Sequence, residues 1–173
     1  MKTLYILRHA KSDQGDGSIR DHDRPLNGRG REAAPQMGAY LKAKGYKPGV
    51  ILCSTARRTV ETCDLVRSSL GDMTVVFEEG LYLAEARAIL DRVRRLDDGL
   101  GSAMVIGHSP GLEQLATGLS ASPKTEDEER LHRRMRDKFS TCALAVIQFP
   151  AKTWREIKLG GGMLIDFMRP RDF

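Results

Sequence analysis

Histidine and arginine side chains stand together at several points where an apolar, β-rich run of the sequence stops. The segments are Arg8-His9-Ala10-Lys11, Ser54-Thr55-Ala56-Arg57-Arg58 and Gly107-His108-Ser109-Pro110-Gly111. A guanidinium group forms paired hydrogen bonds with phosphate oxygens and keeps its charge at any working pH. A neutral imidazole close to such cations can attack phosphorus, because neighbouring positive charge disfavours its protonated form. These residue types therefore suit phosphoryl transfer, which needs positioning and charge stabilisation.

The spacing of the cysteines and histidines indicates neither a metal site nor a disulfide framework. No H-x-x-x-H or C-x-x-C pattern occurs, and the clustered cations would repel a metal ion. We therefore expect no metal and no other cofactor. The three cysteines, Cys53, Cys63 and Cys142, are an odd number without ligand spacing, which favours a reducing compartment, the cytoplasm.

Length and composition are those of one globular domain. The chain has 173 residues, of which 40% are hydrophobic and 29% are charged. No apolar run approaches the ~20 residues that cross a bilayer, and the apolar N-terminus is too short for a signal peptide. We therefore expect a single domain over residues 1–173 that does not contact a membrane.

The positive charge is concentrated at the start of the chain. The formal net charge is +5, yet residues 1–60 hold twelve Lys or Arg and five Asp or Glu, a net +7. Such a surplus indicates either a solvated basic face or a site for an anion. Nucleic-acid binding is not expected, because this segment has no aromatic interleaving and no recognisable binding motif.

Strands and helices alternate over the first two-thirds of the chain. The patterns predict strands over 3–8, 50–53, 74–77 and 103–107, and helices over 28–44, about 55–70, 85–96 and from 109 onward. Ser54 or Thr55 is expected to cap the second helix, and Pro35 to kink the first helix or delay its start. The charged segment 122–138 is predicted to be an exposed helix, followed by strands over 142–149, 154–159 and 163–168.

This alternation predicts an α/β fold, a three-layer α/β/α sandwich with a mostly parallel central sheet. The closing strands should add antiparallel pairing at one edge. In such sheets ligands bind beyond the carboxyl ends of the strands. The chemistry is therefore expected just after Leu7, Cys53, Phe77 and Gly107.

Four motifs, in order along the whole chain, resemble those of the histidine phosphatase superfamily. Their family patterns are R-H-G/A, R-P-L-x-x-x-G, S-x-x-x-R-x-x-x-T and G-H-x-P-x-L. They are matched here by Arg8-His9-Ala10, Arg24-Pro25-Leu26 with Gly30, Ser54 to Thr62, and Gly107 to Leu112. The small size, the R-H-A-K-S start and the Arg169-Pro170-Arg171-Asp172 tail are similar to the SixA-type branch, the phosphohistidine phosphatases.

The resemblance implies roles for four residues in particular. His9 would be the nucleophile and would become phosphohistidine. Arg8 and Arg58 would clamp the phosphoryl oxygens, and His108 would donate a further hydrogen bond as a cation. These four residues form the expected catalytic group.

The resemblance also suggests four residues around the substrate. Ser54 would position the pocket, and Arg24 would contact the anion or anchor its own loop. Lys11 and Arg57 are candidates for the rim. Arg57 is expected to point away from Arg58, because one helical step turns the side chain by about 100°.

The sequence departs from the larger members of the family in its proton donor. Those proteins use a carboxylic acid after the third strand to protonate the leaving group. Glu78 and Glu79 are the candidates here, although neither lies in a clear acid motif and a surface position is the simpler interpretation. The SixA-type branch is similar in lacking an obvious acid. An imidazole leaves phosphohistidine as a neutral molecule when its other nitrogen is protonated, so it needs less acid help.

The connection between residues 107 and 142 is too short for a large cap domain, so an open pocket is expected. An open pocket suits a phosphohistidine displayed on another protein. Our hypothesis is a metal-independent phosphatase with a phospho-His9 intermediate that acts on such a protein. The alternatives are a small phosphomonoester as substrate and a non-catalytic module that binds phosphorylated ligands. In each case inorganic phosphate or sulfate is expected to bind in the pocket.

Overall fold

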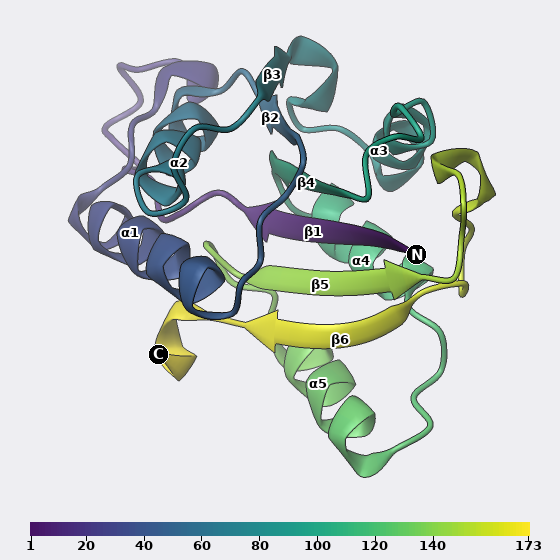
Figure 1. Cartoon of the computed structure of the whole chain (residues 1–173). Helices are drawn as coiled ribbons and strands as arrows, with labels where there is room; N and C mark the ends of the chain where they lie inside the picture. The colour runs from purple at the N-terminus through teal and green to yellow at the C-terminus, as the bar shows by residue number, and fades with distance from the viewer.

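A six-stranded sheet runs through the centre of the protein in the order β3-β2-β4-β1-β5-β6 (Figure 1). The computed structural model describes residues 1–173. Its strands are β1 (Lys2–Arg8), β2 (Ile51–Ser54), β3 (Val75–Glu78), β4 (Ser102–Gly107), β5 (Leu144–Phe149) and β6 (Met163–Met168). Strands β3, β2, β4 and β1 pair in parallel, whereas β5 pairs antiparallel with both β1 and β6. The predicted mostly parallel sheet with antiparallel edge pairing is confirmed.

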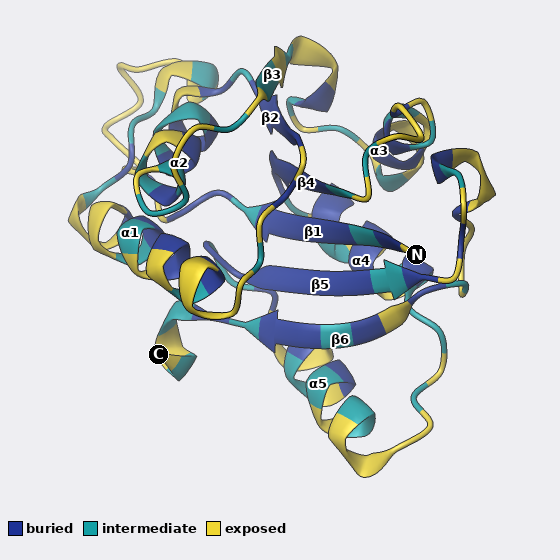
Figure 2. Cartoon of the chain, in the orientation of Figure 1, coloured by how far each residue is buried: buried dark blue, intermediate teal, exposed yellow.

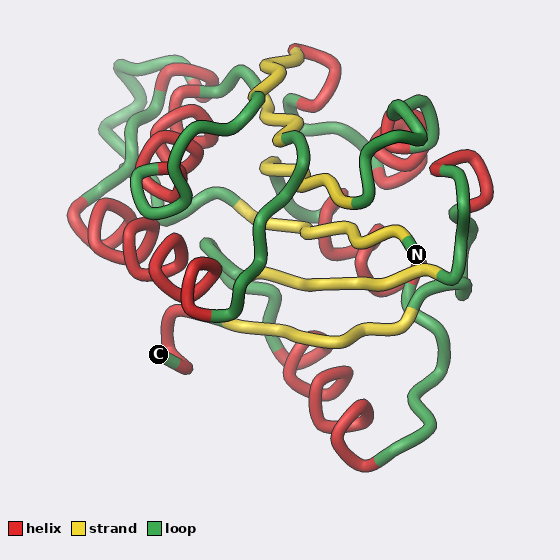
Figure 3. Tube along the Cα trace, viewed as in Figure 1, coloured by secondary structure: helices red, strands yellow, loops and turns green.

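Helices cover both faces of this sheet (Figures 1 and 3). They are α1 (Gly28–Ala43), α2 (Arg57–Arg67), α3 (Ala86–Val93), α4 (Gly111–Leu119) and α5 (Glu126–Asp137). Helices α1 and α2 pack in one core cluster of 16 buried residues, and α3, α4 and α5 pack in another of 26. The fold is therefore the predicted three-layer α/β/α sandwich. None of the helices combines the length and apolar composition that crossing a membrane requires.

The two cores explain why the central strands are apolar without interruption. Successive side chains of a strand point to opposite faces of the sheet. On β1, Leu4 and Ile6 belong to the larger core, and Tyr5 and Leu7 belong to the smaller one. The strands in the middle of the sheet are accordingly buried along most of their length (Figure 2).

The segment 154–159 is not a strand, and that prediction was wrong. Trp154 instead opens a short 3-10 helix, Trp154–Glu156, in the connection between β5 and β6. The indole is fully buried, and its Nε1 donates to the carbonyl oxygen of Leu100 at 3.0 Å. Strands β5 and β6 pair with each other directly, so the sheet has no place for a strand between them.

Two predicted helix starts also differ from the structure, whereas the predicted start at Gly28 is confirmed. Helix α2 begins at Arg57 after Ala56, so neither Ser54 nor Thr55 caps it. Helix α4 begins one residue after Pro110. Helix α1 begins at Gly28 and continues past Pro35, so Pro35 does not delay its start. Asn27 explains why α1 begins at Gly28, because its side chain accepts a hydrogen bond from the amide of Gly30 at 3.0 Å.

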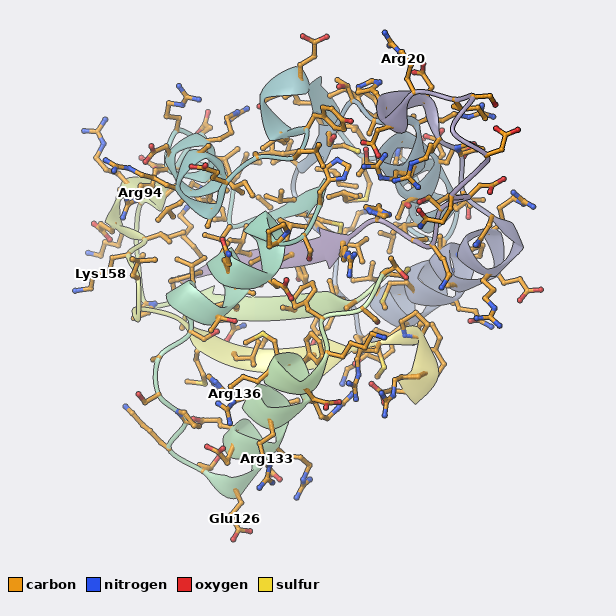
Figure 4. All side chains as sticks on the ribbon, turned by 180° about the vertical axis from the view of Figure 1, so that it is seen from behind. Arg20, Arg94, Glu126, Arg133, Arg136 and Lys158 are labelled. Carbon is orange, nitrogen blue, oxygen red and sulfur yellow. The ribbon has the colours of Figure 1, made fainter.

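The charged segment before β5 forms α5, which has four consecutive acidic residues, 126–129, in its first turn and its arginines after them. Glu126, Arg133 and Arg136 project from this helix into solvent (Figure 4). Within this helix, ion pairs join Arg130 to Asp127 and Arg136 to Glu129. His132 and Met135 are its two buried residues, and the rest of the helix is exposed or half-buried, as predicted.

Gly30 is expected to be essential for the loop that follows β1. A Cβ atom at this position would lie 2.1 Å from the carbonyl oxygen of Lys11, within backbone that cannot move cheaply. We therefore expect Gly30→Ala to lower the free energy of unfolding by about 1–3 kcal/mol, measured by urea denaturation.

Gly28→Ala on the same helix is the matched control, because its nearest atom would be the mobile Nη2 of Arg31 at 4.0 Å. We expect that variant to be as stable as the parent protein. Equal stability of the two variants would contradict the close approach of Gly30 to Lys11.

Candidate active site

A cavity of about 340 Å³ opens beside the carboxyl ends of the parallel strands. Arg8 at the end of β1 lies in register with Gly107 at the end of β4, so the residues that follow both strands meet there. The lining residues are Arg8, His9, Lys11, Ser12, Gln14, Asp21, Arg24, Arg58, Leu83, His108, Ser109 and Thr141. The expected catalytic group, His9, Arg8, Arg58 and His108, is thus gathered in one cavity at the predicted edge of the sheet.

His9 is held with one ring nitrogen bonded and the other available. Its Nδ1 lies 2.6 Å from the carbonyl oxygen of Ala10. A carbonyl oxygen only accepts, so Nδ1 carries the proton and donates it, which leaves the lone pair on Nε2. The backbone is fixed as well, because the His9 amide donates to Gly107 at 3.0 Å and the Cys142 amide donates to the His9 carbonyl at 2.9 Å.

The surroundings of His9 keep its imidazole neutral. His9 is 7% exposed, and this burial, together with the positive charges of Arg58, Arg8 and Arg24, lowers the pKa of its imidazole to about 4. The hydrogen bond to Ala10 acts in the opposite direction and only partly offsets these effects. A neutral ring with a free Nε2 is the form of histidine that can act as a nucleophile.

Arg8 and Arg58 approach the cavity from two different elements. Arg8 ends β1 and donates from Nη1 to the carbonyl oxygen of Phe139 at 2.9 Å. Arg58, in the first turn of α2, is 3% exposed and donates to the backbone and carboxylate oxygens of Asp21 at 2.7 and 3.1 Å. Both guanidinium groups therefore lie at fixed positions beside His9.

Several buried polar atoms at this cavity have no hydrogen-bond partner. Five such side-chain atoms occur in the protein, and four of them belong to residues that line the cavity: Arg8 Nε, Arg58 Nε, His108 Nδ1 and Ser109 Oγ. Burying an unsatisfied polar atom costs about 1–3 kcal/mol. Their concentration here is typical of a site that binds a ligand rich in hydrogen-bonding oxygens.

His108 differs from the expectation that it is a cation. Its ring centroid lies 5.3 Å from that of His9, and its Nε2 lies 2.8 Å from Oγ of Ser54. Burial, together with the nearby His9 and Arg58, lowers the pKa of His108 to about 3, so the ring is neutral at neutral pH. Ser54 is fully buried behind His108, so it orients this ring and does not line the cavity.

Asp21 and Tyr82 belong to the site and were missed by the sequence analysis. The Asp21 carboxylate accepts hydrogen bonds from Arg58, from Arg24 and from the hydroxyl of Tyr82. These partners hold the pKa of Asp21 well below its usual range, so it is ionised at neutral pH. Two features of the sequence could have indicated them. Asp21 stands three residues before Arg24, and Tyr82 lies in the segment after the third strand.

The predicted rim residues divide into two groups. Lys11 and Arg24 line the cavity, and Arg24 also anchors its loop by donating to Ser12 and to the Asp13 carbonyl, both at 2.9 Å. Arg57 does not reach the cavity, because it points away from Arg58 and pairs with Glu61 at 3.5 Å. Its expected contact with substrate is therefore not supported by the structure.

The two candidate general acids also lie outside the cavity. Arg92 donates to both carboxylate oxygens of Glu78, at 2.8 and 2.9 Å, and so holds it toward α3. Glu79 is exposed and does not line the cavity. Asp21 is the only carboxylate among the lining residues. No group of three or more His, Cys, Asp or Glu side chains is arranged to hold a metal ion.

The pKa of His9 can be measured directly by following its ring resonances in an NMR titration. We expect titration near pH 4, and we expect Arg58→Met to raise this pKa because a neighbouring positive charge is removed. Arg57→Met is the matched control, since its guanidinium pairs with Glu61, and it should leave the titration unchanged. A His9 pKa near the ordinary value of about 6.5 would contradict this account of the site.

The sequence of this chain is similar to those of known proteins. The family model for branch 1 of the histidine phosphatase superfamily matches residues 4–85. An uncharacterized protein of Mycobacterium tuberculosis strain H37Rv is 34% identical over 165 residues, which cover 95% of this chain and 100% of the relative. The first motifs of the chain and its overall length are therefore shared with known sequences.

Solved structures extend the likeness to the complete fold. A candidate phosphohistidine phosphatase SixA from Agrobacterium tumefaciens has a TM-score of 0.81 and 27% identity, with 98% of each chain covered. The protein histidine phosphatase SixA complexed with tungstate has a TM-score of 0.76 and 21% identity, covering 98% of this chain and 97% of that one. These likenesses support a phosphatase. The chain belongs to the histidine phosphatase superfamily, in its SixA-type branch.

Proposed function

We propose that this protein is a metal-independent phosphatase that removes the phosphoryl group from phosphohistidine on another protein, through a covalent phospho-His9 intermediate. The observation that carries this proposal is the neutral His9 ring. Its Nδ1 is bonded to Ala10, and its free Nε2 lies in a cavity with two arginines and several unsatisfied donors. The tungstate bound by the SixA structure of the same fold supports an oxyanion as the ligand.

In the first step, Nε2 of His9 attacks phosphorus with its lone pair. The new bond joins Nε2 to phosphorus, and the bond from phosphorus to the substrate imidazole breaks. The electron pair of the broken bond stays on the leaving nitrogen. Arg8 and Arg58 balance the charge on the equatorial oxygens, which is the main requirement of phosphoryl transfer. His108 can donate to an oxygen through Nδ1 if its proton sits there, with Nε2 accepting from Ser54.

The carboxylates of the chain favour a substrate that leaves without acid help. Glu78 is paired with Arg92 and does not line the cavity, so it does not reach a leaving alkoxide. Asp21 lines the cavity, but its three hydrogen-bond donors keep its pKa low, so it holds no proton to donate. An imidazole protonated on its other nitrogen departs as a neutral molecule. Phosphohistidine therefore fits this cavity better than an ordinary phosphate ester of an alcohol.

In the second step, water attacks phosphorus of phospho-His9. The bond between Nε2 and phosphorus breaks, its electron pair returns to Nε2, and inorganic phosphate leaves with the oxygen of water. The proton lost by water passes to phosphate or solvent.

The cytoplasm is the compartment that we propose, in keeping with three buried cysteines that form no disulfide.

The activity can be tested with a phosphorylated histidine domain, free phosphohistidine, and sugar and nucleotide phosphates. We expect the phosphohistidine substrates to have the higher kcat/KM, and His9→Ala to lower kcat by about a thousandfold or more. His132→Ala, which removes a histidine on α5 far from the cavity, is the control.

Each alternative has its own result in this experiment. Unchanged turnover by His9→Ala would overturn the mechanism. A clear preference for sugar or nucleotide phosphates would replace protein phosphohistidine by a small phosphomonoester. Accumulation of stable phospho-His9 without release of phosphate would indicate a module that binds phosphorylated ligands without turnover.

Asp21 is expected to weaken the binding of inorganic phosphate, because its carboxylate occupies Arg58 and repels a second anion. We expect Asp21→Asn to lower the Kd for phosphate about three- to tenfold in calorimetry, a modest gain because the carboxylate is 48% exposed. Asp23→Asn makes the same charge change on an exposed pair with Arg20 and should have little effect. Equal or weaker binding by Asp21→Asn would show that Asp21 instead holds Arg58 in its binding position.

A further inference from the structure

A second depression, of about 460 Å³, adjoins the cavity that holds His9. Arg8, Lys11 and Thr141 line both, so the two are continuous. We call the second one the basic groove and define it by its five cations, which are Arg8, Lys11, Arg29, Lys138 and Arg171. Three of them, Arg29, Lys138 and Arg171, do not line the His9 cavity.

The basic groove carries positive charge that the protein itself does not neutralise. No carboxylate is among its lining residues. Lys11, Arg29 and Lys138 form no salt bridge, and Asp137 approaches Arg171 only to 4.0 Å while pairing with Arg169. Lys138 follows the last turn of α5, so the acidic first turn of that helix lies at its far end. Five cations from separate segments therefore produce a local positive field.

The basic groove is suited to a ligand with several carboxylates along its length rather than to a second phosphate group. A built phosphate site would present buried donors at fixed positions, as the His9 cavity does. Lys11, Arg29, Lys138 and Arg171 are instead exposed, with Arg171 at 62%, and no residue unique to the groove has an unsatisfied buried atom. Mobile exposed cations act through charge complementarity rather than through a single geometry.

We propose that the basic groove binds an acidic segment of the partner protein, rich in Asp and Glu, next to the phosphohistidine that enters the cavity. This proposal rests on the proposed function, because it assumes that the partner protein carries phosphohistidine. The groove selects among phosphoproteins by the charge beside the phosphorylated residue. Its cations accelerate association and add modest affinity, and both effects weaken as salt screens them.

The test compares two phosphohistidine peptides that differ only in their flanks, one with Asp and Glu and the other with Asn and Gln. We expect the parent protein to prefer the acidic peptide by about tenfold in kcat/KM at low ionic strength. The triple variant Arg29→Glu, Lys138→Glu, Arg171→Glu should lose this preference. Its kcat/KM for free phosphohistidine should stay close to that of the parent.

The control is the triple variant Lys152→Glu, Arg155→Glu, Lys158→Glu. It makes the same change in net charge with exposed residues in the connection between β5 and β6 (Lys158 is labelled in Figure 4). That connection follows Phe149, which pairs with Lys2 at the opposite end of β1. We expect this control to keep most of the preference. Equal kcat/KM for the two peptides with the parent protein, or an equal loss in both triple variants, would overturn the proposal.

A binding measurement separates this proposal from the proposed function. Fluorescence anisotropy with the same two peptides lacking the phosphoryl group needs no turnover. We expect the acidic peptide to bind the parent protein more tightly than the groove variant, even if no phosphohistidine substrate is hydrolysed. Equal binding would overturn the groove proposal while leaving the phosphatase proposal intact. Tighter binding of a single-stranded oligonucleotide than of the acidic peptide would assign the groove to nucleic acid instead.

Discussion

The site depends on keeping one imidazole neutral among fixed positive charges. A phosphoryl group is drawn to cations, whereas its acceptor must offer a lone pair. Burial and the charges of Arg8 and Arg58 lower the pKa of His9, so the same arginines that would hold phosphate also keep the ring unprotonated. The carbonyl oxygen of Ala10 then decides which nitrogen is free, because it accepts the proton of Nδ1. Neighbouring groups thus set both the charge of the His9 ring and its tautomer.

The sandwich supplies the rigidity that this arrangement needs. Thr62 of α2 accepts a hydrogen bond from the Ala10 amide at 2.9 Å and donates to the Arg58 carbonyl at 2.7 Å, so it joins the His9 segment to the helix that carries Arg58. From the other side, Gly30 lets α1 approach the backbone of Lys11. The residues after β1 are therefore fixed by elements on both sides, and a displacement of either would move His9 relative to its arginines.

The fold and the central residues could be predicted because they follow from periodicity and from the position of strand ends. Apolar runs predicted the parallel strands, and their carboxyl ends brought Arg8, His9, Arg58 and His108 together. The turn of one helical step separated Arg57 from Arg58. Both features follow from the local pattern of residues and from the rule that parallel strands end at the same edge of a sheet.

Other features could not be predicted because they depend on the path of loops and on burial. Asp21 meets Tyr82 across a separation of 61 residues, and no periodic pattern connects them. The charge of His108 follows from its burial beside His9, which no spacing reveals. Tryptophan is common in strands, which favoured the wrong prediction. The position of Trp154 is instead set by the carbonyl group of Leu100, to which its indole donates a hydrogen bond.

The most direct test of the central claim is to identify the phosphorylated atom in protein quenched with alkali during turnover. Peptide mapping with NMR of the phosphorylated peptide distinguishes the two ring nitrogens. The account predicts a phosphoryl group on Nε2 of His9, because Nδ1 is bonded to Ala10. A phosphoryl group on Nδ1 of His9, or on His108, would contradict it.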